Sequence, residues 1–197
     1  MPFTRSADPD QEPGQLADLF AADRRFWGYL PNSATTFGVR PAVYAAWRQL
    51  NGAIKAGMPA RRYELATLAA AVELRSSYCS LAHGKVLAED HLSEDQVVAI
   101  AAGGVDRLSA EDAAIVTLAR HVVRNAPGVT ARDLESLRIA GLGDDEIFDV
   151  ILATAARCFF STALDATGTQ PDAAFNGLPD RVRDALTVGR PRAMASR

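Results

Sequence analysis

The sequence predicts an all-α protein, and three observations support this expectation. Apolar residues recur every three or four positions along much of the chain, which is the spacing of one helical face. No segment shows the sustained alternation of apolar and polar residues, bounded by hairpin turns, that strands would show. Several segments begin with a serine or threonine followed three residues later by an acid or amide, which is typical of helix starts. We therefore expect a bundle of about eight helices with short connections.

The first part of the chain predicts two helices separated by an aromatic loop. Residues 15–25 carry leucine and phenylalanine at helical spacing, and residues 26–32 hold Phe, Trp and Tyr before a proline. The second helix is expected over residues 41–56, because proline suits a first helical position and Gly57 is a good stop. One face of this helix gathers four apolar side chains: Val43, Trp47, Leu50 and Ile54.

The middle of the chain predicts a helix from Pro59 through Val72, a break near residues 75–77 and a further helix to Asp90. Three later helices are marked by capping pairs. These pairs are Ser93 with Gln96, Ser109 with Asp112, and Thr130 with Asp133. Because a capping pair forms locally, each one predicts where a helix begins.

The last long helix is expected to begin at Asp144. Its expected core side consists of Ile147, Val150, Ile151, Thr154, Cys158 and Thr162. A short helix is expected over residues 180–186. Residues 1–14 carry prolines and charges without periodicity, so we expect a flexible arm there, a single helical domain over residues 15–187 and a flexible tail over residues 188–197.

Composition narrows the class of protein. The chain has 197 residues, of which 48% are hydrophobic and 23% charged, with a net charge of -3, values typical of a soluble globular domain. No basic patch suits nucleic acid. No apolar run approaches the roughly 18 residues of a membrane span. Without a secretion signal at the N-terminus, we expect the cytoplasm. The two cysteines are then expected to be free thiols.

The segment from Ser76 to His83 holds the strongest chemical pattern. With a cysteine at position 76 it would read C-x-x-C-x-x-x-H, a redox dithiol followed by a histidine one helical turn later. If Ser76 caps a helix, Cys79 is its third residue, where free N–H groups and the helix dipole favour a thiolate. The imidazole of His83 then lies on the same face.

Glu64 lies 12 residues before Ser76. On a preceding antiparallel helix it would reach the same place and orient the imidazole or relay a proton. A simpler interpretation stays open for each of these residues. Cys79 would fill core volume, His83 would belong to a polar network, Ser76 would only cap a helix, and Glu64 would be a solvated acid.

Other groups carry weaker signals. Trp27 and Tyr29 would wall a pocket, pack a subunit interface or cover the core. Cys158 is interpreted as a core residue. His91 and His121 are isolated in the sequence, and no set of four ligands suits a closed zinc site, so we expect no metal and no cofactor.

The pattern from Glu64 to His83 resembles the active-site signature of the AhpD-like alkylhydroperoxidases, within the carboxymuconolactone decarboxylase superfamily. That signature is a glutamate, eleven residues and then C-x-x-C-x-x-x-H. Tyr78 precedes the second cysteine as in many relatives, and residues 28–32 resemble the entry loop of the peroxidase-related branch. The helix over residues 147–168 is similar to the C-terminal helix of that branch, and the resemblance covers roughly residues 15–175.

The resemblance implies an all-helical fold that assembles as a dimer, trimer or hexamer. It implies that Cys79 meets the peroxide and that His83 and Glu64 relay protons. It also implies that position 76 supplies the thiol that closes the disulfide, which Ser76 cannot do. Three outcomes remain open: an external thiol reduces oxidised Cys79, Cys158 acts as a distant resolving thiol, or the peroxidase activity is lost.

The sequence therefore supports a peroxidase-like oxidoreductase with one reactive thiolate, acting on a hydroperoxide or small electrophile in a mostly apolar pocket. Ser76 would cap the helix and hydrogen-bond the thiolate. Two alternatives stay open. One is a carboxymuconolactone decarboxylase-like enzyme, for which Arg61, Arg62 and Arg75 lie nearby in sequence. The other is a non-catalytic oligomeric scaffold.

Overall fold

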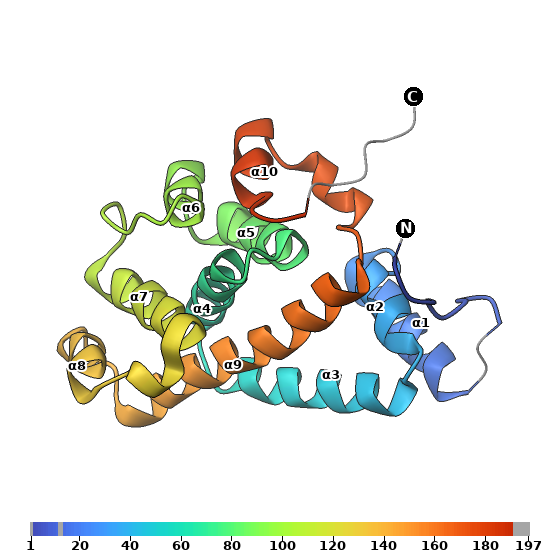
Figure 1. Cartoon of the computed structure of the whole chain (residues 1–197), viewed down its shortest axis with the longest axis horizontal. Coiled ribbons are helices and arrows are strands. Elements are labelled where there is room, and N and C mark those ends of the chain that lie inside the picture. The colour runs from blue at the N-terminus through green and yellow to red at the C-terminus, as the bar shows by residue number, and fades with distance from the viewer. Residues whose placement is uncertain (1, 12–13, 191–197) are drawn as a thin grey trace.

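The computed structural model describes residues 2–11 and 14–190. Helices account for all the regular structure in these residues, so the all-α prediction is confirmed (Figure 1). Ten α-helices form within the described residues, compared with about eight expected, together with the 3-10 helices η1 and η2. In chain order they are α1 (Gln15–Trp27), α2 (Asn32–Gly38), α3 (Pro41–Ala56), α4 (Ala60–Glu73), α5 (Ser77–Asp90), α6 (Glu94–Ala101), α7 (Ala110–Asn125), η1 (Ala126–Gly128), α8 (Ala131–Ile139), α9 (Asp144–Thr167), η2 (Ala173–Gly177) and α10 (Asp180–Leu186).

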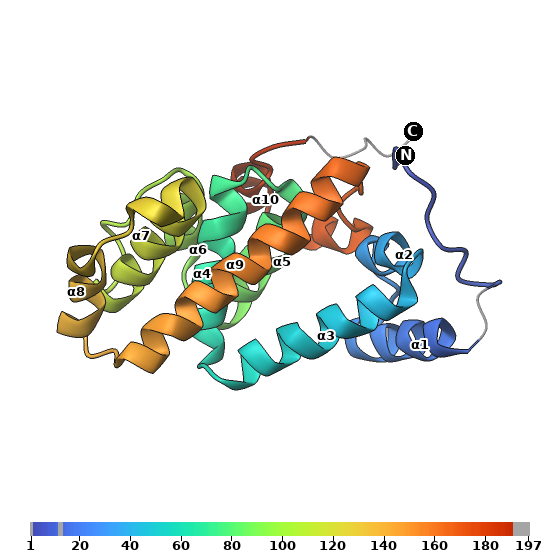
Figure 2. The same cartoon turned by 60° about the horizontal axis from the view of Figure 1, so that its bottom comes forward.

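Helix α4 is the centre of the fold. Every residue from Tyr63 to Ala71 is buried, because α5, α7 and α9 pack around it. Small alanines on α4 let these neighbours approach closely, as expected for a helix with no solvent face. Helix α9 crosses in front of α4 in Figure 2, and α3 contacts α9 on the other side. This arrangement brings side chains from α3, α4, α5 and α9 together.

Helix α9 is also long and apolar enough to span a membrane by length and composition, and among the described residues it alone meets that test. The expectation of no such run was wrong, because this 24-residue helix contains an 18-residue window with a mean hydropathy of 1.6. Its apolar residues pack against α4 and α7, and α9 is therefore a core helix of the bundle.

All three predicted capping residues begin a helix, and Gln96 and Asp133 return the bond as predicted, whereas the carboxylate of Asp112 binds Arg61. Ser93 and Ser109 accept hydrogen bonds from the backbone N–H groups of Gln96 and Asp112, and the backbone N–H of Thr130 donates to the carboxylate of Asp133 at 2.7 Å. These three helices begin where local hydrogen bonding fixes their starts.

The aromatic loop expected over residues 26–32 is shorter than predicted. Helix α1 continues through Trp27 and ends at Gly28, whose φ of 78° is the left-handed conformation that glycine adopts easily. Helix α2, which the sequence did not indicate, begins after Pro31. It has no side-chain cap and is held by packing of its buried residues, among them Phe37, which stacks on Phe160 of α9 at 4.9 Å.

Two predicted helix faces differ from the observed ones. On α3, Trp47 and Ile54 are buried, but Val43 and Leu50 are 47% and 53% exposed, because α3 is covered on one side only. On α9, Thr162 is exposed and Cys158 is half-buried. The buried stripe of α9 instead includes Arg157 and Ser161.

The described ends of the chain pack on the helices. The backbone N–H groups of Phe3 and Ala7 donate to carbonyls of Thr167 and Thr35. Near the other end, the N–H of Gly189 donates to the hydroxyl of Ser77 at 2.9 Å. Residues 2–11 and 188–190, expected in the arm and the tail, therefore contact the domain, while the rest of the expected tail, residues 191–197, lies outside the described residues.

Candidate active site

The turn between α4 and α5 positions the sequence-predicted thiol. Arg75 adopts a φ of 57°, which reverses the chain after α4. Ser76 is extended and occupies the N-cap of α5, so Cys79 is the third helical residue, as its spacing predicted. The backbone N–H groups in the first turn of α5 have no partner within the helix and point towards its N-terminus, where Cys79 lies. Cys79 is almost completely buried, at 1% exposure.

Glu64 and His83 form a hydrogen-bonded pair. The Nδ1 of His83 on α5 lies 2.6 Å from Oε2 of Glu64 on α4, and the Nζ of Lys55 on α3 lies 3.7 Å from Oε1 of the same carboxylate. Burial raises the pKa of Glu64, but the nearby His83, Lys55 and Arg157 outweigh it and lower this pKa below its ordinary value. Glu64 is therefore ionised at neutral pH.

His83 is neutral at the same pH. Burial and the positive charge of Arg157 lower the pKa of His83 to about 4, although Glu64 opposes this shift. Because Glu64 is an anion that only accepts, we assign the ring proton to Nδ1, which donates to Glu64. The Nε2 atom is then left with a free lone pair that can accept a proton.

Arg157 on α9 is the residue of this region that the sequence analysis did not single out. Its Nη1 lies 3.5 Å from the Sγ of Cys79, and its Nη2 lies 3.2 Å from the hydroxyl of Tyr63 on α4. The guanidinium is buried. One signal in the sequence marks it, since Arg157 is a cation in the middle of the apolar stretch of α9.

The expected contacts of Cys79 are only partly present. Within residues 2–11 and 14–190, the hydrogen-bond partner of Sγ is Arg157, and that of His83 Nδ1 is Glu64. His83 and Cys79 share one face of α5 but do not hydrogen-bond each other there. A proton that moves between them needs a bridging water or substrate.

The predicted role of Ser76 needs correction. Its hydroxyl is fully buried but makes no capping hydrogen bond and none to Cys79 within the described residues. It faces the carboxyl of Asp165 on α9 instead. Burial raises the pKa of Asp165, and the Ser76 hydroxyl and Arg190 oppose that rise. The serine keeps the N-cap position by its backbone conformation alone.

Two predicted pocket residues, Tyr78 and Tyr29, lie in a different polar cluster. The Tyr78 hydroxyl lies 2.7 Å from the carboxylate of Asp172, and the Tyr29 hydroxyl lies 3.1 Å from the same oxygen. The backbone N–H of Asn32 donates to the other oxygen at 2.8 Å. This cluster ties the start of α2 to α5.

Trp27, the third predicted pocket residue, is 49% exposed, with its ring edge-to-face against Phe26.

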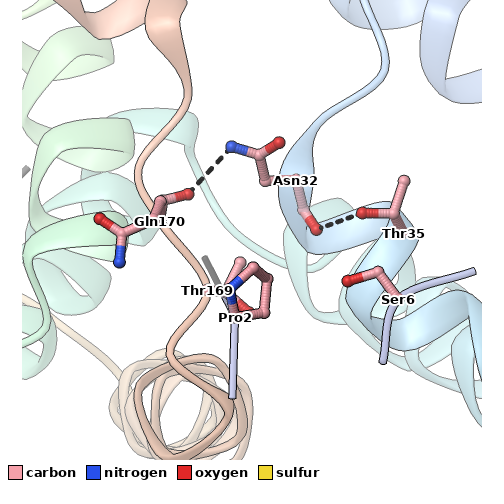
Figure 3. Close-up of a pocket in the computed structure, with 6 residues that line it drawn as sticks. All are labelled: Pro2, Ser6, Asn32, Thr35, Thr169 and Gln170. Atoms are coloured by element: carbon pink, nitrogen blue, oxygen red, sulfur yellow. Dashed lines mark hydrogen bonds between the residues drawn. The ribbon is translucent and has the colours of Figure 1, made fainter. Parts of the chain in front are cut away.

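Two hollows lie on the described residues, and neither surrounds the thiol. One, of about 300 Å³, is lined mostly by polar residues and lies between the N-terminal segment, α2 and the chain after α9 (Figure 3). The smaller, about 230 Å³, is an apolar surface groove lined by Val43, Ala46, Trp47, Leu50 and Phe159. Cys79, His83 and Glu64 line neither, so the thiol is closed off from both hollows.

The described residues contain no cluster of three His, Cys, Asp or Glu side chains arranged as metal ligands. Cys158 follows Arg157 on α9 and is half-buried, and burial raises the pKa of its thiol. The two cysteines are not joined by a disulfide bond.

Residues 41–119 match the family described as Carboxymuconolactone decarboxylase family (CMD), and the fold around this segment is AhpD-like. Over that segment the chain is similar to this family. The match spans Glu64, Cys79 and His83 but ends before α9, so Arg157 lies outside the matched segment.

Several solved structures share this fold. An uncharacterized peroxidase-related protein with an AhpD core from Ralstonia eutropha has a TM-score of 0.79 and 22% identity, over 88% of this chain and 94% of that one. A peroxidase-related protein from Silicibacter has a TM-score of 0.75 and 19% identity, over 88% and 94%. The debrominase Bmp8, in complex with 2,3,4-tribromopyrrole, has a TM-score of 0.73 and 17% identity, over 92% and 96%. No curated protein sequence matches this chain.

Proposed function

We propose that this protein is a peroxidase-like oxidoreductase that uses Cys79 as its single reactive thiolate, with His83 and Glu64 as a proton relay. The observation that supports this proposal most is the pair formed by His83 and Glu64 at 2.6 Å, on the same face of α5 as Cys79. A neutral imidazole whose Nδ1 is fixed by a carboxylate presents Nε2 as a base, which is the arrangement that general acid–base catalysis requires.

The reaction begins when the thiolate of Cys79 attacks the outer oxygen of a hydroperoxide. The O–O bond breaks, the sulfur is oxidised to sulfenic acid, and the alkoxide leaving group takes up a proton to become an alcohol. The Nε2 atom of neutral His83 takes up a proton from solvent and passes it through water to the alkoxide. Glu64 keeps the imidazole oriented and stabilises its transient positive charge.

An external thiol completes the cycle. One thiol condenses with the sulfenic acid to form a mixed disulfide and water, and a second thiol releases Cys79 as the other disulfide forms. Ser76 cannot replace this partner because it has no sulfur. We further propose that the protein acts as a homo-oligomer in the cytoplasm, where small thiols are abundant.

The substrate is proposed to be small. Cys79 is 1% exposed, and the side chain of His83 on the same face of α5 is only 12% exposed. Hydrogen peroxide and short alkyl hydroperoxides fit such a site better than lipid hydroperoxides do. A bulky substrate would require α5 to move away from α4.

A small halogenated aromatic compound is a second candidate substrate, because the fold neighbour Bmp8 is a debrominase solved with a brominated pyrrole. The same thiolate would take the halogen as a sulfenyl halide while the ring carbon gains a proton. An external thiol would then release the halide ion and form a mixed disulfide. Both candidates need Cys79 as the nucleophile.

The test compares the two cysteines of the chain as matched variants. Purified protein, Cys79→Ser and Cys158→Ser are each mixed with hydrogen peroxide, and free thiols and sulfenic acid trapped by dimedone are counted. The unchanged protein and Cys158→Ser are expected to form one sulfenic acid per chain, and Cys79→Ser none. A Cys79→Ser protein that consumes peroxide at an unchanged rate would contradict the proposal.

A further inference from the structure

Arg157 is a buried cation without a carboxylate partner among the described residues. Its exposure is 4%, and its two hydrogen bonds go to the sulfur of Cys79 and the hydroxyl of Tyr63. Its Nε has no hydrogen-bond partner in residues 2–11 and 14–190. Burial of an unpaired charge is costly, so buried cations in folded proteins are paired with an anion or bound by several acceptors.

Arg120 on α7 is a second buried arginine, and its partners differ from those of Arg157. It donates to the carbonyl oxygens of Gly103 and Ile100, at 2.9 and 2.7 Å. Its charge is thus satisfied by ordinary backbone acceptors at the end of α6. Arg157 has no such carbonyl among its partners. The positive charge of Arg157 therefore needs a different compensating group.

The groups that face Arg157 leave one candidate for that compensation. Glu64 is close enough for its charge to interact with Arg157, but its two oxygens bind His83 and Lys55. Tyr63 stays protonated at neutral pH, because burial raises its pKa, and its hydroxyl donates to Asn51 at 2.7 Å. Cys79 is the remaining hydrogen-bonded partner, and a thiolate at this position would balance the charge of Arg157.

His83 is unsuited to be the counter-cation of a thiolate here. Because burial and Arg157 lower its pKa to about 4, the imidazolium form is scarce at neutral pH. The usual thiolate–imidazolium pair of cysteine enzymes is therefore disfavoured in this site. The ring of Phe160 covers the guanidinium of Arg157 at 5.2 Å and stacks against Trp47, which keeps water away from the charge.

We propose that Arg157, and not His83, is the counter-cation that keeps Cys79 ionised. The guanidinium donates Nη1–H to the sulfur in a charge-assisted hydrogen bond inside a dry environment, where such a bond is strong. His83 is then free to handle the proton of the leaving group alone. The catalytic meaning of this assignment rests on the function proposed above, but the ion pair itself does not.

The test measures the charge of the sulfur directly. In a Cys158→Ser background, Cys79 is the one thiol of the chain, and its ionisation is followed by ultraviolet thiolate absorbance at neutral pH. That absorbance is expected in the background protein and is expected to fall about tenfold in Arg157→Met, because the stabilising cation is gone. Arg157→Lys, which keeps the positive charge, is expected to restore much of the absorbance.

Arg120→Met is the matched control, since it removes a buried guanidinium that does not contact Cys79. It is expected to lower stability while leaving the thiolate absorbance of the folded protein unchanged. The proposal is overturned if the background protein shows no thiolate absorbance at neutral pH, a result that does not depend on any arginine variant folding. It is also overturned if Arg157→Met, folded by circular dichroism, keeps that absorbance.

These measurements separate the two proposals. If the background protein shows a strong thiolate signal but does not react with peroxides, the proposed Arg157–Cys79 pair stands and the proposed peroxidase function is refuted. If the background protein and its Arg157→Met variant turn over peroxide equally, the proposed peroxidase function stands and the proposed role of Arg157 is refuted.

Discussion

The imidazole of His83 and the carboxylate of Glu64 lie 2.6 Å apart across the contact between α4 and α5, although 19 residues separate them in the chain. The reversal at Arg75 folds the two helices against each other and brings this pair into register. The pair consists of an ionised carboxylate and a neutral imidazole.

Glu64→Gln is expected to slow the reaction of Cys79 with hydrogen peroxide about 100-fold, the lower range of general acid–base effects. The amide keeps the shape of the side chain but removes the charge that stabilises the ring when it carries a proton. Stopped-flow peroxide consumption measures the rate. The matched control is Glu89→Gln on the exposed side of α5, where Glu89 pairs with Lys85, and its rate should not change.

His83 makes the protein less stable in mild acid. Its pKa is about 4 in the folded chain, against an ordinary value of 6.5, so the unfolded chain binds more protons between these values. The free energy of unfolding should therefore fall as the pH drops from 6.5 towards 4, by on the order of 2 kcal/mol.

Urea unfolding followed by circular dichroism at several pH values measures this slope. His83→Gln is expected to flatten it, leaving mainly the contribution of the acids. A His83→Gln protein with the same slope as the unchanged protein would show that the ring is not a buried neutral group.

Ser76→Cys is expected to let position 76 form a disulfide with Cys79 after oxidation, and to raise turnover with a dithiol reductant roughly tenfold. Because Asp165 faces position 76, a negative charge on its carboxyl should disfavour ionisation of the new thiol. Adding Asp165→Asn should therefore raise turnover further. Free-thiol counts before and after peroxide report the disulfide, and two thiols that persist after oxidation would disprove the pairing.

Asp172→Ala is expected to destabilise the fold by about 2 to 4 kcal/mol, because buried donors on Asn32 and Tyr78 lose their acceptor. Asp172→Asn keeps one acceptor oxygen and should cost about 1 kcal/mol. Chemical denaturation measures both. The exposed Asp180, in the first turn of α10, supplies the control, and Asp180→Ala should change stability by less than about 0.5 kcal/mol. Equal losses at the two positions would mean that the Asp172 cluster is not a tie between α2 and α5.

Several parts of the molecule were predictable because their causes are local. The starts of α6, α7 and α8 follow from Ser93, Ser109 and Thr130, whose capping bonds span only three residues. Cys79 and His83 share a face because they lie one helical turn apart. Helix α2 escaped prediction because it has no cap and is stabilised by distant partners such as Phe160.

The sequence by itself determined the helices with strong local signals, the N-terminal position of Cys79 on its helix, and the spacing of Glu64 and His83 on neighbouring helices. Only the tertiary structure decided what surrounds the sulfur. Arg157 lies 78 residues from Cys79 in the chain and reaches it because α9 packs across α4 and α5. The direction of Ser76 towards Asp165, and of Tyr78 towards Asp172, was decided in the same way. Spacing along a chain fixes which face a side chain occupies, but the charge opposite that face depends on which helix packs there.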